Sequence, residues 1–215
     1  AMSQTAVQEP KKERGPLNGV DTPTLFATND GLTCVHALVA TDLPWPGTVF
    51  LSQNWKFTAP VYIVRPALFM PVVCEMVRLS VLHGNGPVAP FGYVEYALIR
   101  TAIGDAMGGR AWVELALALQ GSVGARAVGA KVEVVAYAFV THWSRPMRES
   151  VEPLLESVQR GLDVGDFEFA GYGAVLFCTA MLYAGYVQEG VLGELQRYAD
   201  LLVRIKQAYA RVFAA

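Results

Sequence analysis

The feature that most constrains this chain is the segment Gly161–Tyr172, which has the pattern of a sharp corner between two helices. An amphipathic pattern ends near Val164 and Gly165, and glycine readily adopts the left-handed conformation that closes a helix. The carboxylate of Asp166 can then accept hydrogen bonds from the free N–H groups of the next helix. Gly171 lies in a run of small residues, so a neighbouring backbone can approach closely. We therefore predict a helical hairpin with Gly165, Asp166 and Gly171 as its structural corner.

Helix signals continue along most of the chain. Apolar residues recur at helical spacing between turn signals that contain glycine or proline. The expected helices are Leu68–His83, Pro87–Met107 with Gly108-Gly109 as its stop, Ala111–Leu119, Lys131–Trp143, a helix capped by Ser150, a helix from Asp166, and a last helix from Glu189 or Gly190.

Pairing these helices gives hairpins that begin near Ala67, Gly109 and Glu149, about 40 residues apart, a period typical of helical-hairpin repeats. Such hairpins bury their apolar faces against their neighbours. The predicted fold class is therefore all-α, with stacked antiparallel helical hairpins. Residues 23–215 form a single helical-repeat domain in this interpretation, although 23–65 carry no clear pattern.

Residues 1–22 are polar and are expected to form a tail compatible with disorder. Ala1-Met2 resembles a cloning remnant, which suggests a piece of a longer chain.

Composition restricts the classes of partner. Hydrophobic residues make up 53% of the chain and charged residues 17%, as in a packed protein. A net charge of −2 argues against a nucleic-acid surface, which needs a basic stripe. Three widely spaced cysteines, Cys34, Cys74 and Cys178, favour buried thiols in a reducing compartment, and we expect a cytoplasmic protein. The uncharged run Phe169–Gln188 is long enough to span a membrane, but its glycines and tyrosines favour a buried core helix.

Candidate chemistry is sparse. None of His36, His83 and His142 has a partner at metal-ligand spacing, so no metal site is predicted. The loop Gly124–Lys131 faintly resembles a phosphate loop, but Val132 stands where a magnesium-binding hydroxyl is needed, so no cofactor is expected.

Acidic residues cluster at Asp163, Asp166 and Glu168, and paired carboxylates can perform acid–base chemistry. Asp166 already has a capping role, and negative charge is favoured in the first helical turn. We therefore predict no catalytic residue.

The last helix and one turn supply candidate interaction residues. Apolar residues along Val191–Val212 alternate three- and four-residue steps, a heptad-like seam. An array cut from a longer chain would expose this seam, so we expect a homodimer through the last helix. The candidate contact residues are His142, Trp143, Leu195, Tyr198 and Leu202.

Several stretches, taken in order, resemble the tetratricopeptide-like helical segment of large multidomain signalling proteins. The stretches are Met76–Ser80, His83–Pro87, Tyr93–Tyr96, Leu115–Leu119, Thr141–Trp143 and Gly161–Tyr172. Proteins of that family join a serine/threonine-kinase-like domain, an AAA-type ATPase module, this segment, a GAF domain and a sensor histidine kinase. The resemblance covers about Pro60 to the C-terminus. It departs at Gly108–Trp112, where the family has an aromatic-glycine step.

The resemblance implies a fragment of a tetratricopeptide-like α-solenoid that carries no catalytic residues. It implies a spacer and interaction surface that couples the ATPase to the output kinase in a bacterial two-component system, with neighbouring domains or a peptide as the protein partner.

Two other functions stay open. A regulator would bind a small apolar ligand in a closed pocket lined by Tyr172, Phe177 and Tyr183. An enzyme of unrecognised type would need convergent polar side chains in a cleft.

Overall fold

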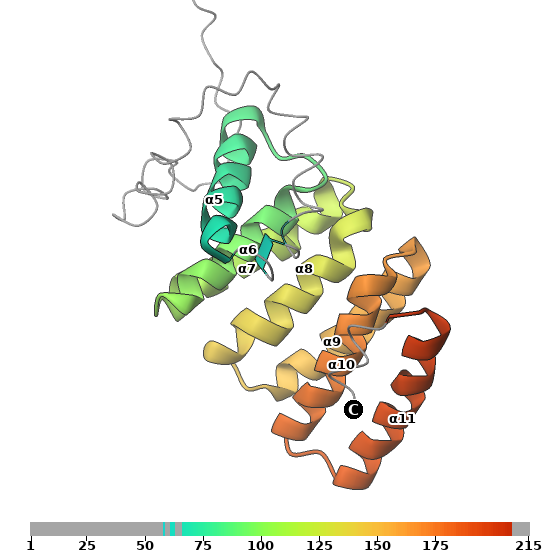
Figure 1. Cartoon of the computed structure of the whole chain (residues 1–215). Coiled ribbons are helices and arrows are strands. Elements are labelled where there is room, and N and C mark those ends of the chain that lie inside the picture. Colours follow the sequence, from blue (N-terminus) through green and yellow to red (C-terminus); the bar gives the residue numbers. More distant parts are fainter. Residues whose placement is uncertain (1–57, 59–60, 63–65, 208–215) are drawn as a thin grey trace, which may run out of the picture.

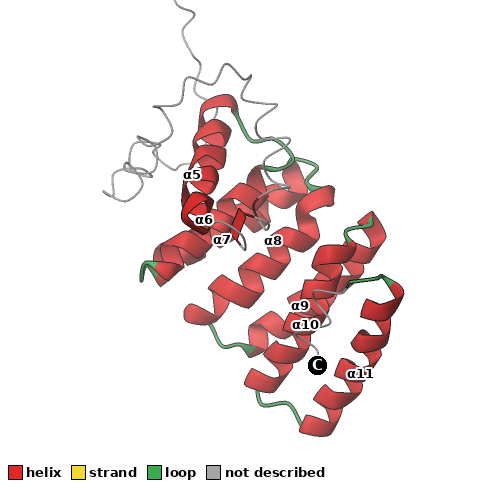
Figure 2. Ribbon diagram, in the orientation of Figure 1, coloured by secondary structure: helices red, strands yellow, loops and turns green. Residues whose placement is uncertain are grey.

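The computed structural model describes Thr58, residues 61–62 and residues 66–207 (Figure 1). This part of the chain forms seven α-helices joined by short connections and contains no strand (Figure 2). The predicted all-α class is therefore confirmed. The expected tail, Cys34, His36 and the end of the predicted last helix lie outside the described residues.

The α-helices are α5 (Pro66–His83), α6 (Ala89–Ala102), α7 (Ala106–Ser122), α8 (Gly129–Val135), α9 (Arg148–Val164), α10 (Phe167–Tyr183) and α11 (Gln188–Arg204). A short 3₁₀ turn, η1 (Arg126–Val128), leads into α8. The helical path of α8 continues through a π-helix, η2 (Ala136–Val140), and a 3₁₀ turn, η3 (Thr141–Trp143). The predicted helix over Lys131–Trp143 is thus present as a path, but its geometry changes after Val135.

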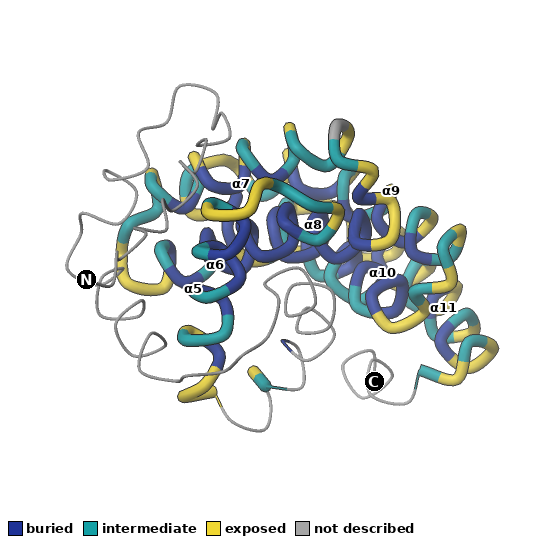
Figure 3. The backbone as a smooth tube through the Cα atoms, turned by 90° about the horizontal axis from the view of Figure 1, so that it is seen from above, coloured by how far each residue is buried: buried dark blue, intermediate teal, exposed yellow. Residues whose placement is uncertain are grey.

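The helices lie in two layers. Helix α8 contacts α6 on one side and α10 on the other, so these three form one layer, while α7 and α9 cover it (Figure 3). The most extensive pairings are α6 with α7 and α9 with α10. The last predicted hairpin is therefore present, but the expected pairing of α7 with α8 is not the dominant one.

Two large hydrophobic clusters fill most of the space between the described helices, and a small third one holds Met76 and Leu79. The first is built mainly from α5 to α8, with Phe169 of α10, and includes Tyr93. The second is built from α9 to α11 and includes Leu154. Tyr137 and Leu176 pack against both large clusters. Tyr137 lies in η2 and Leu176 in α10, so these two elements connect the two large clusters.

The predicted corner is present between α9 and α10. Gly165 closes α9 with φ +76°, in the left-handed region. The Asp166 carboxylate caps α10 by accepting a hydrogen bond from the Phe169 N–H at 3.4 Å. Gly171 is buried, as expected, and the backbones also approach closely at Gly161, where an added Cβ would lie 3.0 Å from the Ala170 N atom.

The predicted stop at Gly108-Gly109 is wrong. Helix α6 ends earlier, Gly104 turns the chain with φ +95°, and Asp105 caps α7 by accepting from the Gly108 N–H at 2.8 Å. Gly109 lies inside α7, where an added Cβ would lie 2.9 Å from the Ala97 carbonyl oxygen of α6. The glycine therefore permits close packing of two helices and ends neither of them.

The predicted cap at Ser150 is also wrong. Helix α9 begins at Arg148, and Ser150 is buried inside it. The N–H groups of Glu149 and Ser150 donate to the Pro146 and Met147 carbonyls, at 3.0 and 2.9 Å. Backbone carbonyls thus accept the hydrogen bonds that a capping side chain would otherwise accept.

Among the described helices, α5 alone has the length and apolar composition to cross a membrane, and 39% of it is buried in the fold. The uncharged run instead contributes α10, a shorter helix with nine buried residues.

Candidate functional site around helix α8

Helix α8 carries oppositely charged residues on opposite sides. Lys131 and Glu133 are two positions apart, and each residue of an α-helix turns by about 100°, so their side chains point about 200° apart. Glu133 meets Arg160 of α9 at 2.9 Å and accepts from Gln120 of α7 at 3.4 Å. Lys131 instead points away from α7 and α9, toward the start of α10.

Lys131 makes a buried ion pair with the corner residue Asp166. Its Nζ lies 2.9 Å from Asp166 Oδ2 and 3.8 Å from the centroid of the Phe169 ring. Lys131 is only 7% exposed, and a buried ammonium group persists only where partners compensate for lost hydration. Asp166 therefore caps α10 and also neutralises a cation from α8.

Glu95 of α6 completes this arrangement. The residue is 4% exposed, and its carboxyl group accepts a hydrogen bond from Thr58. Burial raises the pKa of Glu95 to about 8, an effect that the Thr58 hydrogen bond and the charge of Lys131 partly oppose. Its Oε2 atom is buried and has no hydrogen-bond partner in the described part of the chain. We call Glu95, Lys131 and Asp166 the charged face.

Sequence reasoning found Asp166 but missed Glu95 and Lys131. Helical spacing could have placed Glu95 in the core, because it lies four residues after Phe91 and four before Ile99. Both of these residues are buried. A charged residue between two core positions of one helix is unusual and indicates a specific partner. Nothing local in the sequence connects Lys131 to the corner 35 residues later.

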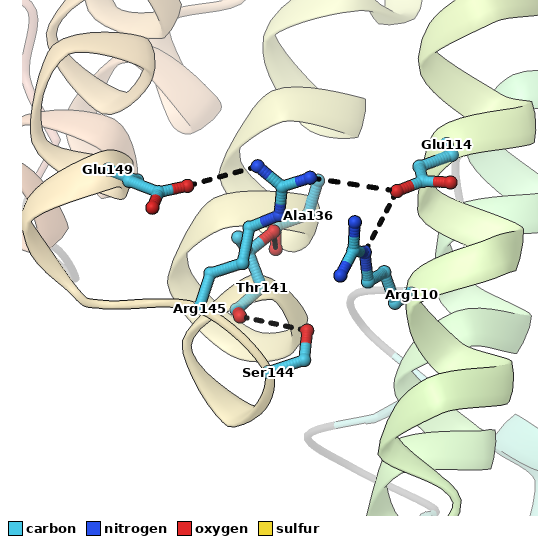
Figure 4. Close-up of polar contacts among 7 residues, drawn as sticks. All are labelled: Arg110, Glu114, Ala136, Thr141, Ser144, Arg145 and Glu149. Carbon is cyan, nitrogen blue, oxygen red and sulfur yellow. Dashed lines mark hydrogen bonds and ion pairs between the residues drawn. The ribbon is translucent and has the colours of Figure 1, made fainter.

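A second polar cluster lies at the other end of the same helical path (Figure 4). Arg145 reaches Glu149 of α9 at 3.1 Å and Glu114 of α7 at 3.8 Å. Glu114 also pairs with Arg110 at 2.9 Å. We call Arg145, Glu114, Glu149 and Arg110 the Arg145 network. It connects α7, the turn after η3 and the start of α9.

Side-chain hydrogen bonds support the segment beside this network. The Thr141 hydroxyl donates to the Ala136 carbonyl at 2.8 Å, and the Ser144 hydroxyl donates to the Thr141 carbonyl at 3.4 Å (Figure 4). These bonds span η2 and η3, which we call the π segment (Ala136–Trp143). The π segment is therefore supported by its own side chains and, through Arg145 after its end, by α7 and α9.

The predicted contact residues His142 and Trp143 lie at the end of the π segment. Trp143 is 65% exposed, and Phe139, four positions earlier, is 42% exposed. His142 is half-buried beside Trp143, with ring centroids 5.5 Å apart, and burial lowers the pKa of His142. The structure thus presents an indole ring at the surface on a supported backbone.

The expectation that the seam of the last helix is exposed is wrong. Tyr198 and Leu202 are buried, and Leu195 is half-buried against the second core cluster. The Tyr198 ring packs edge-on against Phe177 of α10, with centroids 5.9 Å apart. The apolar spacing of these residues is therefore the signature of packing within the chain. The expected homodimer stays a prediction.

A hollow of about 430 Å³ lies between α9 and α11. It is lined by Leu155, Glu156, Val158, Gln159, Leu162, Arg197, Tyr198, Leu201 and Arg204. The three residues predicted to line an apolar pocket do not line this hollow. Phe177 is buried in the second core cluster, and Tyr183 is exposed.

The described residues contain no group of three or more His, Cys, Asp and Glu side chains that could hold a metal ion. No family model, no curated protein and no solved structure matches the chain. The resemblance to multidomain signalling proteins therefore stays a prediction from the sequence.

Proposed function

We propose that this chain is a non-enzymatic helical scaffold that docks another protein through Trp143. In the wider proposal, its helices stack as a tetratricopeptide-like solenoid within a bacterial cytoplasmic signalling protein and couple an ATPase module to an output kinase. The exposed indole of Trp143 on the supported π segment is the observation that carries the docking proposal. The signalling context rests on the sequence resemblance.

Four physical arguments support docking at Trp143. Tryptophan is enriched among the few interface residues that contribute most of the binding energy. A side chain presented on a fixed backbone loses little conformational entropy on binding. The Arg145 network lies beside it and can supply the polar rim that typically surrounds an apolar anchor. Single π-helical turns within helices are also frequent at functional sites.

Site-specific photo-crosslinking in cells tests this proposal. A benzophenone amino acid is placed at Trp143 and, in a matched control, at Leu82, which is exposed at the end of α5. We expect a discrete protein adduct at position 143 that is absent at position 82. The Trp143→Ala variant should bind the crosslinked protein about thirtyfold more weakly, the loss expected for an anchor worth about 2 kcal/mol.

The melting temperature of Trp143→Ala should stay close to that of the parent chain, because the ring is largely exposed. Equal adducts at positions 143 and 82, or unchanged affinity in the variant, would contradict docking at this residue.

The hollow between α9 and α11 favours a second function, regulation by a small apolar ligand. Its size is in the range of small-molecule sites, although Arg197 and Glu156 make it partly polar. An apolar dye such as 1-anilinonaphthalene-8-sulfonate should bind there, and Leu162→Trp should block the dye by filling the space. Dye binding that is unchanged in the variant would remove this alternative.

A further inference from the structure

Helix α11 has one side that contacts neither the core nor the hollow. The helix lies at one edge of the described helices and packs mainly against α10 (Figure 1). Leu201 lines the hollow between α11 and α9. Leu192 precedes Leu201 by nine residues, so the two side chains point about 180° apart around the helix. Leu192 therefore points away from the hollow.

Exposed apolar side chains lie along this side of α11. They belong to a stripe with steps of four, three and four residues, which we call the open stripe: Leu192, Gln196, Ala199 and Val203. Leu192 is 63% exposed and Val203 is 54% exposed. The exposed part of an amphipathic helix normally carries polar residues, so two large apolar side chains on one stripe indicate a contact surface for another helix.

The charges at the two ends of the open stripe are complementary. Glu189, in the first turn of α11, lies three residues before Leu192, and Lys206, just after the helix, lies three residues after Val203. Both charged residues are exposed, and neither forms an ion pair with another residue in the described part of the chain. The stripe therefore has an acidic end and a basic end.

This order of residues matches a second copy of the same helix in the antiparallel direction. When Leu192 of each copy lies opposite Val203 of the other, Glu189 of each copy lies opposite Lys206 of the other. A parallel pair would instead bring Glu189 against Glu189 and Lys206 against Lys206. Opposite charges across an interface favour the first arrangement and like charges disfavour the second.

We propose that the open stripe is the contact surface between two copies of this chain, whose α11 helices lie antiparallel across a two-fold axis. The large apolar residues of the stripe lie only about 16 Å apart along one helix. Interfaces that bury much less than about 1,200 Å² are weak and transient, so the dimer forms at high protein concentration and dissociates on dilution. The proposal places the expected homodimer on a different side of α11 from the buried seam, and it is independent of docking at Trp143.

Analytical ultracentrifugation of the full chain tests the proposal. The weight-average mass should rise from that of a monomer toward that of a dimer between about 10 µM and about 1 mM protein. Leu192→Lys places a cation against Val203 in both symmetric contacts and should weaken association at least about tenfold. Met107→Lys adds the same charge at a residue of α7 that is 67% exposed, and should leave association unchanged. A monomer at every concentration, or equal association of the two variants, would overturn the proposal.

Two charge reversals test the antiparallel arrangement. Glu189→Lys alone and Lys206→Glu alone each place like charges opposite one another, so each variant should associate at least about fivefold more weakly than the parent chain. In a mixed pair of the two variants, both of these contacts join opposite charges, so the mixture should associate about as strongly as the parent chain. This recovery would also exclude unfolding as the cause of the single losses. A mixture that associates no better than either variant alone would overturn the proposal.

Discussion

The charged face and the Arg145 network each place one basic side chain beside two acidic residues, but in opposite environments. In one, Lys131 lies among the acids Glu95 and Asp166, and in the other, Arg145 lies between Glu114 and Glu149. The Lys131 side chain is 9% exposed, whereas the Arg145 side chain is 43% exposed. Because the charges around these two basic side chains match, a comparison of the two clusters isolates the effect of burial.

Exposure to water determines how much the ion pairs of each cluster contribute to stability. Exposed ion pairs are screened and typically contribute about 0–1 kcal/mol. Removal of one partner from a buried pair commonly costs about 3–5 kcal/mol, because the remaining charge keeps its desolvation penalty. We expect the same type of substitution to have a large effect in the charged face and a small one in the Arg145 network.

The largest effect is expected for Lys131→Met. This change leaves Asp166 without its cation and should lower the free energy of unfolding by about 3–5 kcal/mol. Urea denaturation measures the loss, and Lys206→Met at an exposed position is the matched control, with a change within about 0.5 kcal/mol. Similar losses for the two variants would contradict the assignment of a buried pair.

The next effect is a pH dependence at Glu95. Its pKa is raised to about 8 in the folded protein, so between about pH 4.5 and 8 the folded state holds a proton that the unfolded state releases. This group's contribution to stability should therefore fall as the pH rises through that range, by at most about 1.4 kcal/mol per unit. Glu95→Gln does not ionise, so its stability relative to the parent chain should rise over the same range. A constant difference between the two proteins would show that Glu95 titrates normally.

Two substitutions of Asp166 can separate its capping role from its ion pair with Lys131. Asp166→Ala removes the cap, worth about 0.5–2 kcal/mol, and also leaves Lys131 unpaired. Asp166→Asn keeps a capping oxygen and loses only the charge. The melting temperature should fall further for the alanine variant, and equal melting temperatures would mean that the cap contributes nothing.

The smallest effect is expected for Arg145→Ala. It should change the free energy of unfolding by less than about 1 kcal/mol, and the change should shrink further at high salt. Thermal denaturation at two salt concentrations measures both. A loss as large as that of Lys131→Met would remove the contrast between the two clusters.

Local chemistry decided which parts of the fold the sequence could predict. Gly165 and Asp166 act within one turn of their own positions, so the corner was predicted correctly. Gly109 lies inside α7 and allows close packing against Ala97 of α6. The sequence pattern does not distinguish such a glycine from one that ends a helix. The pairing of Lys131 with Asp166 depends on how three helices are placed, which no local spacing encodes.

The seam of α11 shows the same limit of prediction from sequence. The spacing of Leu195, Tyr198 and Leu202 correctly indicated an apolar face but did not identify what covers it. Periodicity shows that a face is buried, and only the three-dimensional arrangement shows whether a neighbouring helix of the same chain or another molecule buries it.

The π-helix η2 has a geometric consequence for the direction of Trp143. A ring closed by an i→i+5 hydrogen bond contains one residue more than an α-helical ring, so the stretch accommodates one residue beyond the regular count. Deleting a single residue within Ala136–Val140 would convert it to ordinary helix, in which one residue fewer turns through nearly the same angle, so the direction of everything that follows would be kept. The same deletion within the regular helix α8 would rotate the following residues by about 100° and turn the indole away from solvent. The π turn is thus the place in this helical path where a change in chain length leaves the orientation of Trp143 intact.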